Sequence, residues 1–257
     1  MKVRITTALF DIKRDKIGDG RSINEYLSWF KDTLKIKCNM TIYTEQKFEH
    51  FIKENRNNEY DTKIIIQNLE ETPFYKWKTK ITEIINSDYF KSKMNDLNRI
   101  ECYLPEYNII QYSKFEWLKN TAKQNTDDYF FWMDAGCSRF FNGFDLNQEW
   151  PNKFKLDKNK LTIQGNNNFI KNFDKLNIEN YIWDNNCILV GTLFGGGKTI
   201  INKLSKEIDN IFKYLIESNC INNEQFALAI FAKQNLELMN IIIKLNGTHL
   251  PLFNYLK

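Results

Sequence analysis

The chain has 257 residues, of which 42% are hydrophobic and 15% aromatic, enough for one large α/β domain or two small ones. Its 36 Lys and Arg residues against 32 Asp and Glu give a net charge of +4, without the concentrated basic block that would indicate a nucleic-acid partner. No apolar stretch approaches the ~20 residues needed to cross a bilayer, and the five cysteines contain no Cys-x-x-Cys pair, so we expect a soluble cytoplasmic protein with free thiols and no transmembrane segment.

The first half of the chain alternates strand-like and helix-like segments. Residues 3–10 form a β-rich run, and residues 22–34 carry apolar side chains at helical spacing, with Ser22 as N-cap and Glu25 completing a capping box. The segments that follow are strands at 40–43 and 63–67, a helix at 46–53, two helical stretches after Pro73 and a helix at 107–123. This alternation predicts right-handed crossovers between parallel strands.

Residues 129–137 are the most informative stretch, because an apolar run of strand length ends on Asp134 and Gly136. Such a run predicts a strand buried on both faces, in the middle of a largely parallel sheet covered by helices. Ligands of open sheets bind beyond the carboxyl ends of the strands, so we expect Asp134 to face a cleft. Gly136 would let the backbone approach a ligand closely. The alternative is that Asp134 only caps the segment after the strand.

The second half begins with polar, irregular composition over residues 142–180, which predicts surface excursions. An apolar strand at 187–193 then meets three glycines, and the last predicted elements are helices at 199–218 and 223–234 and a strand at 236–244. The fold class is therefore α/β, with a central, mostly parallel mixed sheet covered by helices. We expect a single domain over residues 1–257, with a nucleotide-binding half at 1–136 and an acceptor-side half at 137–257.

Six short segments resemble the HtrL/YibB family in sequence and order, between about Ile5 and Asn235. They are Thr7–Arg14, Arg21–Phe30, Ile42–Thr44, Pro105–Tyr107, Ser113–Phe115 and Trp132–Gly136. That family looks like glycosyltransferases of the GT-A architecture, in which a nucleotide-sugar lies across a Rossmann-like half. The resemblance implies transfer of a sugar from a nucleoside-diphosphate-sugar, first of all a UDP-sugar, to a hydroxyl of a carbohydrate or protein acceptor.

A sugar-nucleotide donor requires positive charge where its diphosphate leaves, from a divalent cation or from cationic side chains. Asp134 is placed to bind Mn²⁺ or Mg²⁺ together with the phosphates. GT-A enzymes usually carry Asp-x-Asp at this strand end, whereas this chain has Asp134, Ala135 and Gly136, without the second carboxylate. His249 is the candidate for a second metal ligand, and imidazole suits Mn²⁺ better than Mg²⁺; the alternative is an exposed residue near the terminus.

The nucleotide-sugar site implied by the resemblance lies at two strand ends. Its members are Thr7, Ala8, Phe10 and Asp11 at the first strand, the cations Arg14, Arg21 and Lys114, and Trp132, Met133, Asp134, Ala135 and Gly136 at the later strand. Phe10 would stack on the base, Asp11 would accept a ribose or base hydrogen bond, and the guanidinium of Arg14 matches phosphate oxygens. Solvent exposure of Arg21 and Lys114, and core positions for Phe10 and Trp132, are the alternatives.

On the acceptor side, Gly195, Gly196 and Gly197 would let the backbone pass beneath the donor sugar. They also nearly complete a phosphate-binding P-loop, which lacks only its leading glycine and so leaves a phosphotransferase as an alternative.

Glu224 and Gln225 look like the element that meets acceptor hydroxyls in GT-A folds. Glu224 is the candidate catalytic base, alongside Asp134 as the second catalytic residue; the alternative for Glu224 is interaction with a helix dipole. A non-catalytic nucleotide-sugar-binding module is a further alternative to the enzyme, because fold does not determine activity. The sequence leaves the donor, the acceptor, the stereochemical outcome and peripheral contact with a membrane-attached acceptor open.

Overall fold

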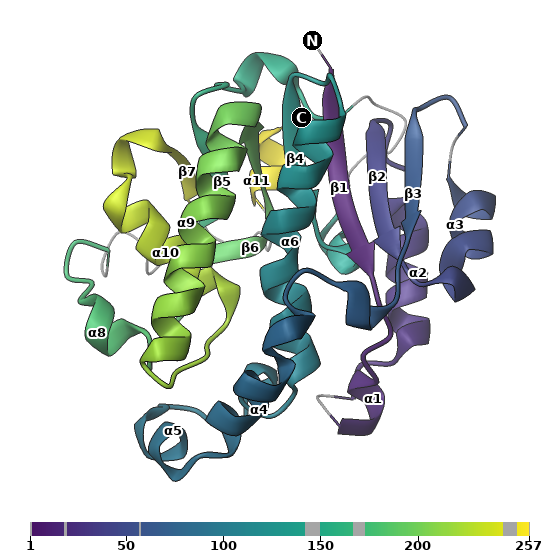
Figure 1. The fold of residues 1–257 in the computed structure, drawn as a ribbon. Coiled ribbons are helices and arrows are strands. Elements are labelled where there is room, and N and C mark those ends of the chain that lie inside the picture. Colours follow the sequence, from purple (N-terminus) through teal and green to yellow (C-terminus); the bar gives the residue numbers. More distant parts are fainter. Residues whose placement is uncertain are drawn as a thin grey trace.

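The structure, a computed structural model, describes residues 2–17, 20–56, 58–141, 150–166, 173–243 and 251–256. Seven strands form one sheet in the order β3-β2-β1-β4-β6-β5-β7 (Figure 1). They are β1 (Val3–Leu9), β2 (Asn39–Thr44), β3 (Thr62–Ile66), β4 (Tyr129–Met133), β5 (Leu161–Gly165), β6 (Leu189–Gly197) and β7 (Met239–Ile243). Strands β1 to β4 are parallel, and β6 runs antiparallel to both of its neighbours.

Helices cover both faces of this sheet. They are α1 (Arg14–Ile17), α2 (Ile23–Thr33), α3 (Glu49–Asn55), α4 (Lys78–Asn86), α5 (Asp88–Lys93), α6 (Pro105–Gln124), α8 (Ile178–Tyr181), α9 (Lys198–Glu217), α10 (Glu224–Gln234) and α11 (Pro251–Tyr255). The long helices α6 and α9 lie side by side across the sheet (Figure 1). A parallel half continued by a mixed half, with helices on both faces, confirms the predicted α/β fold with a central, mostly parallel mixed sheet covered by helices.

The apolar sequence of β4 follows from its position between two hydrophobic layers. Phe130 and Trp132 pack into the core beneath α4, α6, α9 and α10, whereas Tyr129, Phe131 and Met133 pack into the core beneath α2, α3 and α11. Successive side chains of a strand point to opposite faces, so a strand covered on both faces needs apolar residues at every position. All five residues of β4 are buried, which confirms the prediction.

The capping box predicted for the first long helix is also confirmed. The Glu25 backbone N–H donates to Ser22 Oγ over 3.2 Å, and the Ser22 backbone N–H donates to Glu25 Oε2 over 2.7 Å. Satisfying these two helix-terminal groups stabilises the start of α2, by about 1 kcal/mol for a typical N-cap. This fixes the entry of α2 at the sheet edge where β1 ends.

The region predicted as irregular contains one strand, so that prediction was wrong for Leu161–Gly165. Leu161 and Ile163 face one core, but the alternate positions are Thr162 and Gln164, which are buried polar residues. Gln164 is satisfied by a hydrogen bond that its Oε1 accepts from the Leu252 N–H over 3.3 Å. A sequence of this polarity does not show the apolar run typical of a covered strand.

The triple glycine lies within β6, at the opposite edge of the sheet from Asp134. Because β6 is antiparallel to β4, Gly195, Gly196 and Gly197 pair with Phe131, Phe130 and Tyr129. A Cβ on Gly195 would come within 2.4 Å of the Phe131 ring, and one on Gly197 within 2.5 Å of the Lys158 carbonyl, so close packing excludes side chains here. Extended, ladder-paired backbone cannot form a P-loop, so the alternative of a phosphate loop is excluded, and the close packing around these glycines does not favour a position beneath a donor sugar.

Among the described residues, no helix combines the length and the apolar composition that a membrane crossing needs. The five cysteines are free thiols, as predicted, and only Cys187 is partly exposed.

Candidate active site

A cavity of about 130 Å³ lies beyond the carboxyl ends of β1 and β4, the edge at which ligands bind in open α/β sheets. Ten of the predicted donor-site residues line it: Ala8, Phe10, Asp11, Arg14, Arg21, Lys114, Trp132, Asp134, Ala135 and Gly136. Its described lining carries five cationic side chains (Lys13, Arg14, Arg21, Lys114 and Arg139) and two acidic ones (Asp11 and Asp134). The cavity therefore has an excess of positive charge, which suits an anionic ligand.

The other predicted site residues lie elsewhere in the structure. Within the described lining of the cavity there is no contribution from Thr7, Met133, Gly195, Gly196, Gly197, Glu224 or Gln225. Thr7 and Met133 are fully buried within the strands β1 and β4. His249 falls outside the described residues.

Asp134 directs its carboxylate to the cavity and to two side chains behind it. Trp132 Nε1 donates to Asp134 Oδ1 over 2.7 Å, and Lys114 Nζ lies 3.4 Å from the same oxygen. The side chain is 30% exposed. Although Asp134 precedes a 3-10 turn (Ala135–Phe140), its side chain makes no capping hydrogen bond there. The structure thus disagrees with the alternative of a simple cap.

Lys114 is a fully buried cation that joins three elements of the site. Its ammonium donates to Glu224 Oε1 over 2.8 Å and to the Gly191 carbonyl over 3.3 Å, in addition to Asp134. Lys114 lies in the middle of α6, which begins at Pro105. Burial lowers the pKa of Lys114, but the carboxylates of Asp134 and Glu224 outweigh it and hold the pKa above 10.5, so the side chain is charged.

Glu224 is the first residue of α10 and is buried behind Lys114. Burial raises its pKa above the ordinary value of 4.5, although Lys114 opposes this effect. Its Oε2 atom is buried without a hydrogen-bond partner. Gly191 leaves room for the carboxylate, since a Cβ there would lie 2.1 Å from Glu224 Oε1. Glu224 therefore reaches the cavity only through the Lys114 ammonium.

Gln225, the other predicted acceptor-side residue, serves the start of α10. Its backbone N–H donates to Asn223 Oδ1 over 3.0 Å, and its Nε2 donates to the same oxygen over 3.2 Å. Asn223 is thus the N-cap of the helix, and both hydrogen bonds tie Gln225 to that cap.

An aromatic stack supports the floor of the cavity. Phe10 stacks on Trp117 with ring centroids 5.5 Å apart and an interplanar angle of 1°, and Trp117 stacks on Trp132 at 6.2 Å and 12°. Phe10 and Trp132 are 8% and 2% exposed, so both belong to the core and also border the cavity. The stack fixes the indole whose N–H holds Asp134.

Asp11, predicted to contact ribose or base, is held by lysines. Lys13 and Lys47 both form ion pairs with Asp11 Oδ2, and the Asp11 N–H donates to Glu45 Oε2 over 2.7 Å. Although partial burial raises the pKa of Asp11, the hydrogen bonds from Lys13 and Lys47 lower it more, so its pKa lies below 3.8. Asp11 is an ionised carboxylate whose charge is already compensated.

Arginine side chains and tyrosine rings form the remaining wall. Arg14 donates to Tyr26 Oη over 2.5 Å, and its guanidinium lies 5.1 Å from the centre of the Tyr107 ring. Sequence analysis did not single out Arg139, although it follows Asp134 by one short turn and so had to lie at the same sheet edge.

Glu101, also missed from the sequence, is buried beside the site. It forms an ion pair with Arg99, and burial raises its pKa above 4.5 against the opposing charge of Arg99. It interacts electrostatically with Glu224, so two buried acids share this side of the site. Glu101 occupies a short 3-10 turn (Ile100–Cys102), whose sequence carries no signal that would distinguish it.

The predicted metal site is not supported by the described residues. They contain no group of three or more His, Cys, Asp and Glu side chains that could hold an ion. Asp134 Oδ1 is already engaged by Trp132 and Lys114, which leaves one carboxylate oxygen for a cation. Mg²⁺ requires near-octahedral coordination, usually from one or two carboxylates with phosphates and water, and Asp134 is the member of the predicted metal pair that lies within the described residues.

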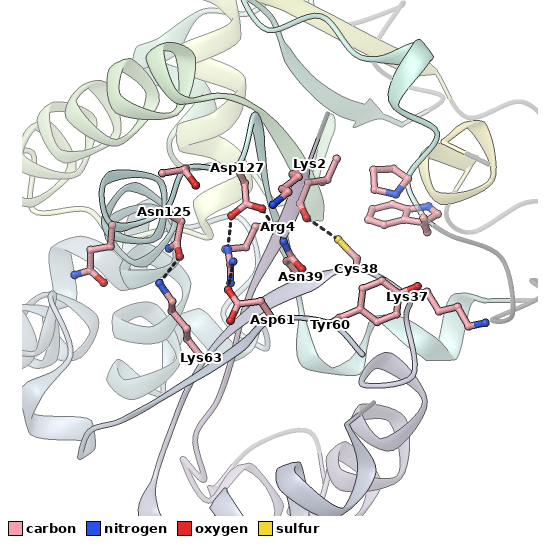
Figure 2. A pocket seen from close by; sticks show the side chains of 15 residues that line it. Lys2, Arg4, Lys37, Cys38, Asn39, Tyr60, Asp61, Lys63, Asn125 and Asp127 are labelled. Atoms are coloured by element: carbon pink, nitrogen blue, oxygen red, sulfur yellow. Dashed lines mark hydrogen bonds and ion pairs between the residues drawn. The ribbon is translucent and has the colours of Figure 1, made fainter. Parts of the chain in front are cut away.

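A larger cavity, of about 780 Å³, lies at the opposite edge of the sheet, beside the amino ends of β1 to β4. Figure 2 shows Arg4 between Asp61 and Asp127 with its charge fully paired. Burial raises the pKa of the Cys38 thiol to about 12, so it is not a nucleophile. The ion pairs of Arg4 join the start of β1 to the residues that precede β3 and β4, and so stabilise this edge of the sheet.

The chain is thus an α/β protein with a helix-covered sheet and a cationic cavity beyond its parallel carboxyl ends, the position at which doubly wound folds bind ligands. The family model described as "Bacterial protein of unknown function (HtrL_YibB)" matches residues 1–256, and the chain belongs to the HtrL/YibB family, as its sequence indicated. No curated protein matches it.

Among solved structures, it is similar to the crystal structure of core-mannan synthase A from Aspergillus fumigatus in its Mn/GDP form. The two chains are 7% identical, the match covers 94% of this chain and 73% of the other, and the TM-score is 0.49.

Proposed function

We propose that this protein is a glycosyltransferase that moves a sugar from a nucleoside-diphosphate-sugar to a hydroxyl of a glycan or protein acceptor. The observation that carries the proposal is the placement of Asp134 in a cavity whose described lining has five cationic and two acidic side chains. A diphosphate leaving group gains negative charge as its bond to the sugar breaks, and fixed cations at that position stabilise the transition state.

The size of the cavity limits what it would hold. At about 130 Å³ it is smaller than the ~300–1,000 Å³ of typical small-molecule sites. It matches a diphosphate or a single sugar ring better than a complete donor. In the proposal the 1–136 half holds the nucleotide and the 137–257 half faces the acceptor, and a UDP-sugar remains the first donor to test.

The acids of the site have different roles in this proposal. Asp134 borders the cavity and is 30% exposed, so it is the carboxylate that would contact the donor sugar or the acceptor hydroxyl. Glu224, at 3% exposure, would act as a positioning residue through Lys114. A general base must lie within hydrogen-bond reach of the proton that it removes, and of these two acids only Asp134 borders the cavity.

Free cysteines agree with a cytoplasmic setting for this reaction, since thiols stay reduced there. The remaining alternative is a nucleotide-sugar-binding module without turnover, which would use the same cationic cavity.

The test is a calorimetric binding screen of UDP-sugars, GDP-sugars and ATP, with and without Mn²⁺, followed by a turnover assay with the sugars that bind. We expect a sugar-nucleotide to bind, and Asp134→Asn to abolish turnover while the unfolding temperature changes little. The matched control is Asp209→Asn, an acid that also pairs with a lysine but is 42% exposed on α9. Binding of ATP alone would rule the transferase out, and sugar-nucleotide binding without hydrolysis or transfer would identify the module.

A further inference from the structure

We infer that Arg139 is a diphosphate-binding residue of the donor site, and that side-chain cations compensate the diphosphate charge without a divalent metal. The inference rests on the proposed function and adds to it the chemistry of leaving-group recognition. It also differs from the expectation of a Mn²⁺ site at Asp134.

Arg139 is oriented toward the cavity by aromatic contacts. Its guanidinium lies 5.1 Å from the centre of the Trp29 ring and 4.7 Å from that of Phe140. Trp29 is itself anchored, since Ser138 Oγ donates to the Trp29 carbonyl over 2.6 Å. Cation–π contacts of this kind hold an arginine in place while they leave its N–H groups available.

The N–H groups of Arg139 lack an acidic partner among the described residues. Its Nε atom is buried and has no hydrogen-bond partner. A buried, unpaired donor on a charged group costs more than the net free energy of an ordinary hydrogen bond. The rest of this partly exposed side chain borders the cavity, where its terminal N–H groups would donate to diphosphate oxygens.

Each of the two acids of the cavity already has a lysine partner. Asp11 pairs with Lys13 and Lys47, and Asp134 pairs with Lys114. Arg139 therefore adds positive charge that no carboxylate of the described lining compensates. A guanidinium presents several donors in a plane that matches two phosphate oxygens at once.

The glycine at position 136, where a second carboxylate was expected, is consistent with charge compensation by arginine. A Cβ at Gly136 would lie 3.1 Å from the Trp29 ring, so a side chain at this position would press on the ring that carries Arg139. The described residues offer no cluster of metal-binding side chains, whereas they bring Arg14 and Arg139 to one cavity. The arrangement favours direct arginine contact with the diphosphate.

The experiment is titration calorimetry of UDP, GDP and inorganic pyrophosphate, in EDTA and in Mn²⁺, with the unmodified protein and its Arg139 variants. We expect UDP or GDP to bind in EDTA with an affinity that Mn²⁺ does not raise. Arg139→Met should weaken binding by about ten- to a hundredfold, as for loss of a hydrogen bond to a charged group. Arg139→Lys keeps the charge but loses the planar guanidinium, so its affinity should lie between those of the unmodified protein and Arg139→Met.

Lys35→Met is the control, because this lysine is 49% exposed and pairs with Asp32 near the end of α2. Unfolding temperatures of all variants separate loss of binding from loss of folding, and Arg139→Lys keeps the test valid where Arg139→Met is unstable. Binding that requires Mn²⁺, or equal affinities for Arg139→Met and the unmodified protein, would overturn the inference while leaving the transferase intact. Failure of every nucleoside diphosphate and sugar-nucleotide to bind the unmodified protein would overturn both.

Discussion

Lys114 Nζ lies 2.8 Å from Glu224 Oε1, and the two side chains are 0% and 3% exposed. This buried ion pair connects the middle of α6 to the first residue of α10, 110 positions apart in the sequence. The same ammonium lies 3.4 Å from Asp134 Oδ1. One cation thus compensates two carboxylates, and the geometry of the cavity depends on it.

Lys114→Met should destabilise the fold strongly. It leaves Glu224 buried without its cation, and breaking one side of a buried pair costs about 3–5 kcal/mol. Denaturant unfolding monitored by circular dichroism measures the change. Lys119→Met is the matched control on the same helix, because this lysine is 34% exposed in its pair with Glu116 and should change the free energy of unfolding by less than about 1 kcal/mol.

The double variant Lys114→Met, Glu224→Leu tests the mechanism of that loss. Replacing both partners of a buried pair by apolar side chains is often close to neutral, so stability should recover by about 2 kcal/mol or more. Equal effects of Lys114→Met and Lys119→Met would contradict the structure, as would a double variant no more stable than Lys114→Met alone.

Gly191→Ala should displace the Glu224 carboxylate, because the added Cβ would lie 2.1 Å from Glu224 Oε1. Overpacking of this kind costs about 1–3 kcal/mol, measured by denaturant unfolding. In a Glu224→Ala background the same glycine substitution should cost little, since the clashing oxygens are gone. Additive effects in the two backgrounds would show that the contact does not constrain the protein.

Because of Glu224, the free energy of unfolding should also decrease as the pH rises. Burial raises its pKa above 4.5, so the folded protein holds this proton more tightly than the unfolded chain does. Its contribution to the free energy of unfolding is fully present below that ordinary value and is lost as the pH rises through the folded-state pKa.

Glu101 has a raised pKa in the same direction, so the measurement is the difference in unfolding free energy between the unmodified protein and Glu224→Gln as a function of pH. The unfolding free energy of the unmodified protein minus that of Glu224→Gln should decrease as the pH rises from 4.5 to the folded-state pKa of Glu224. A constant difference, or one that rises over this range, would contradict the burial argument.

The sequence predicted the parts of this fold that depend on local pattern. The apolar run of β4, the capping box at Ser22 and the acid at the end of β4 all follow from residues close together in the chain. The sequence did not reveal that β6 is antiparallel, and for that reason it placed Gly195 near a ligand, whereas this glycine pairs with Phe131 in the middle of β4. Nor could it reveal the pairing of Lys114 with Glu224, which only the packing of α6 against α10 brings about.

Trp132 and Trp117 allow a test of how Asp134 is positioned. Both belong to one aromatic stack and are 2% and 1% exposed, respectively. Trp132 Nε1 donates to Asp134 Oδ1 over 2.7 Å, whereas Trp117 Nε1 is buried without a hydrogen-bond partner. Replacing either by Phe removes a similar volume from the core and should cost a similar amount of stability, about 1–3 kcal/mol, in denaturant unfolding.

Only Trp132→Phe removes the hydrogen bond that orients the carboxylate, so it alone should impair the donor site. Loss of a hydrogen bond to a charged group corresponds to roughly ten- to a hundredfold weaker binding, to be measured calorimetrically with the sugar-nucleotide that binds the unmodified protein. Trp117→Phe should bind within about twofold of that protein, since it leaves the Asp134 contact intact and single contacts distant from a ligand change affinity little. If both variants lose affinity equally, the stack supports the cavity by packing alone, and the indole N–H has no part in holding Asp134.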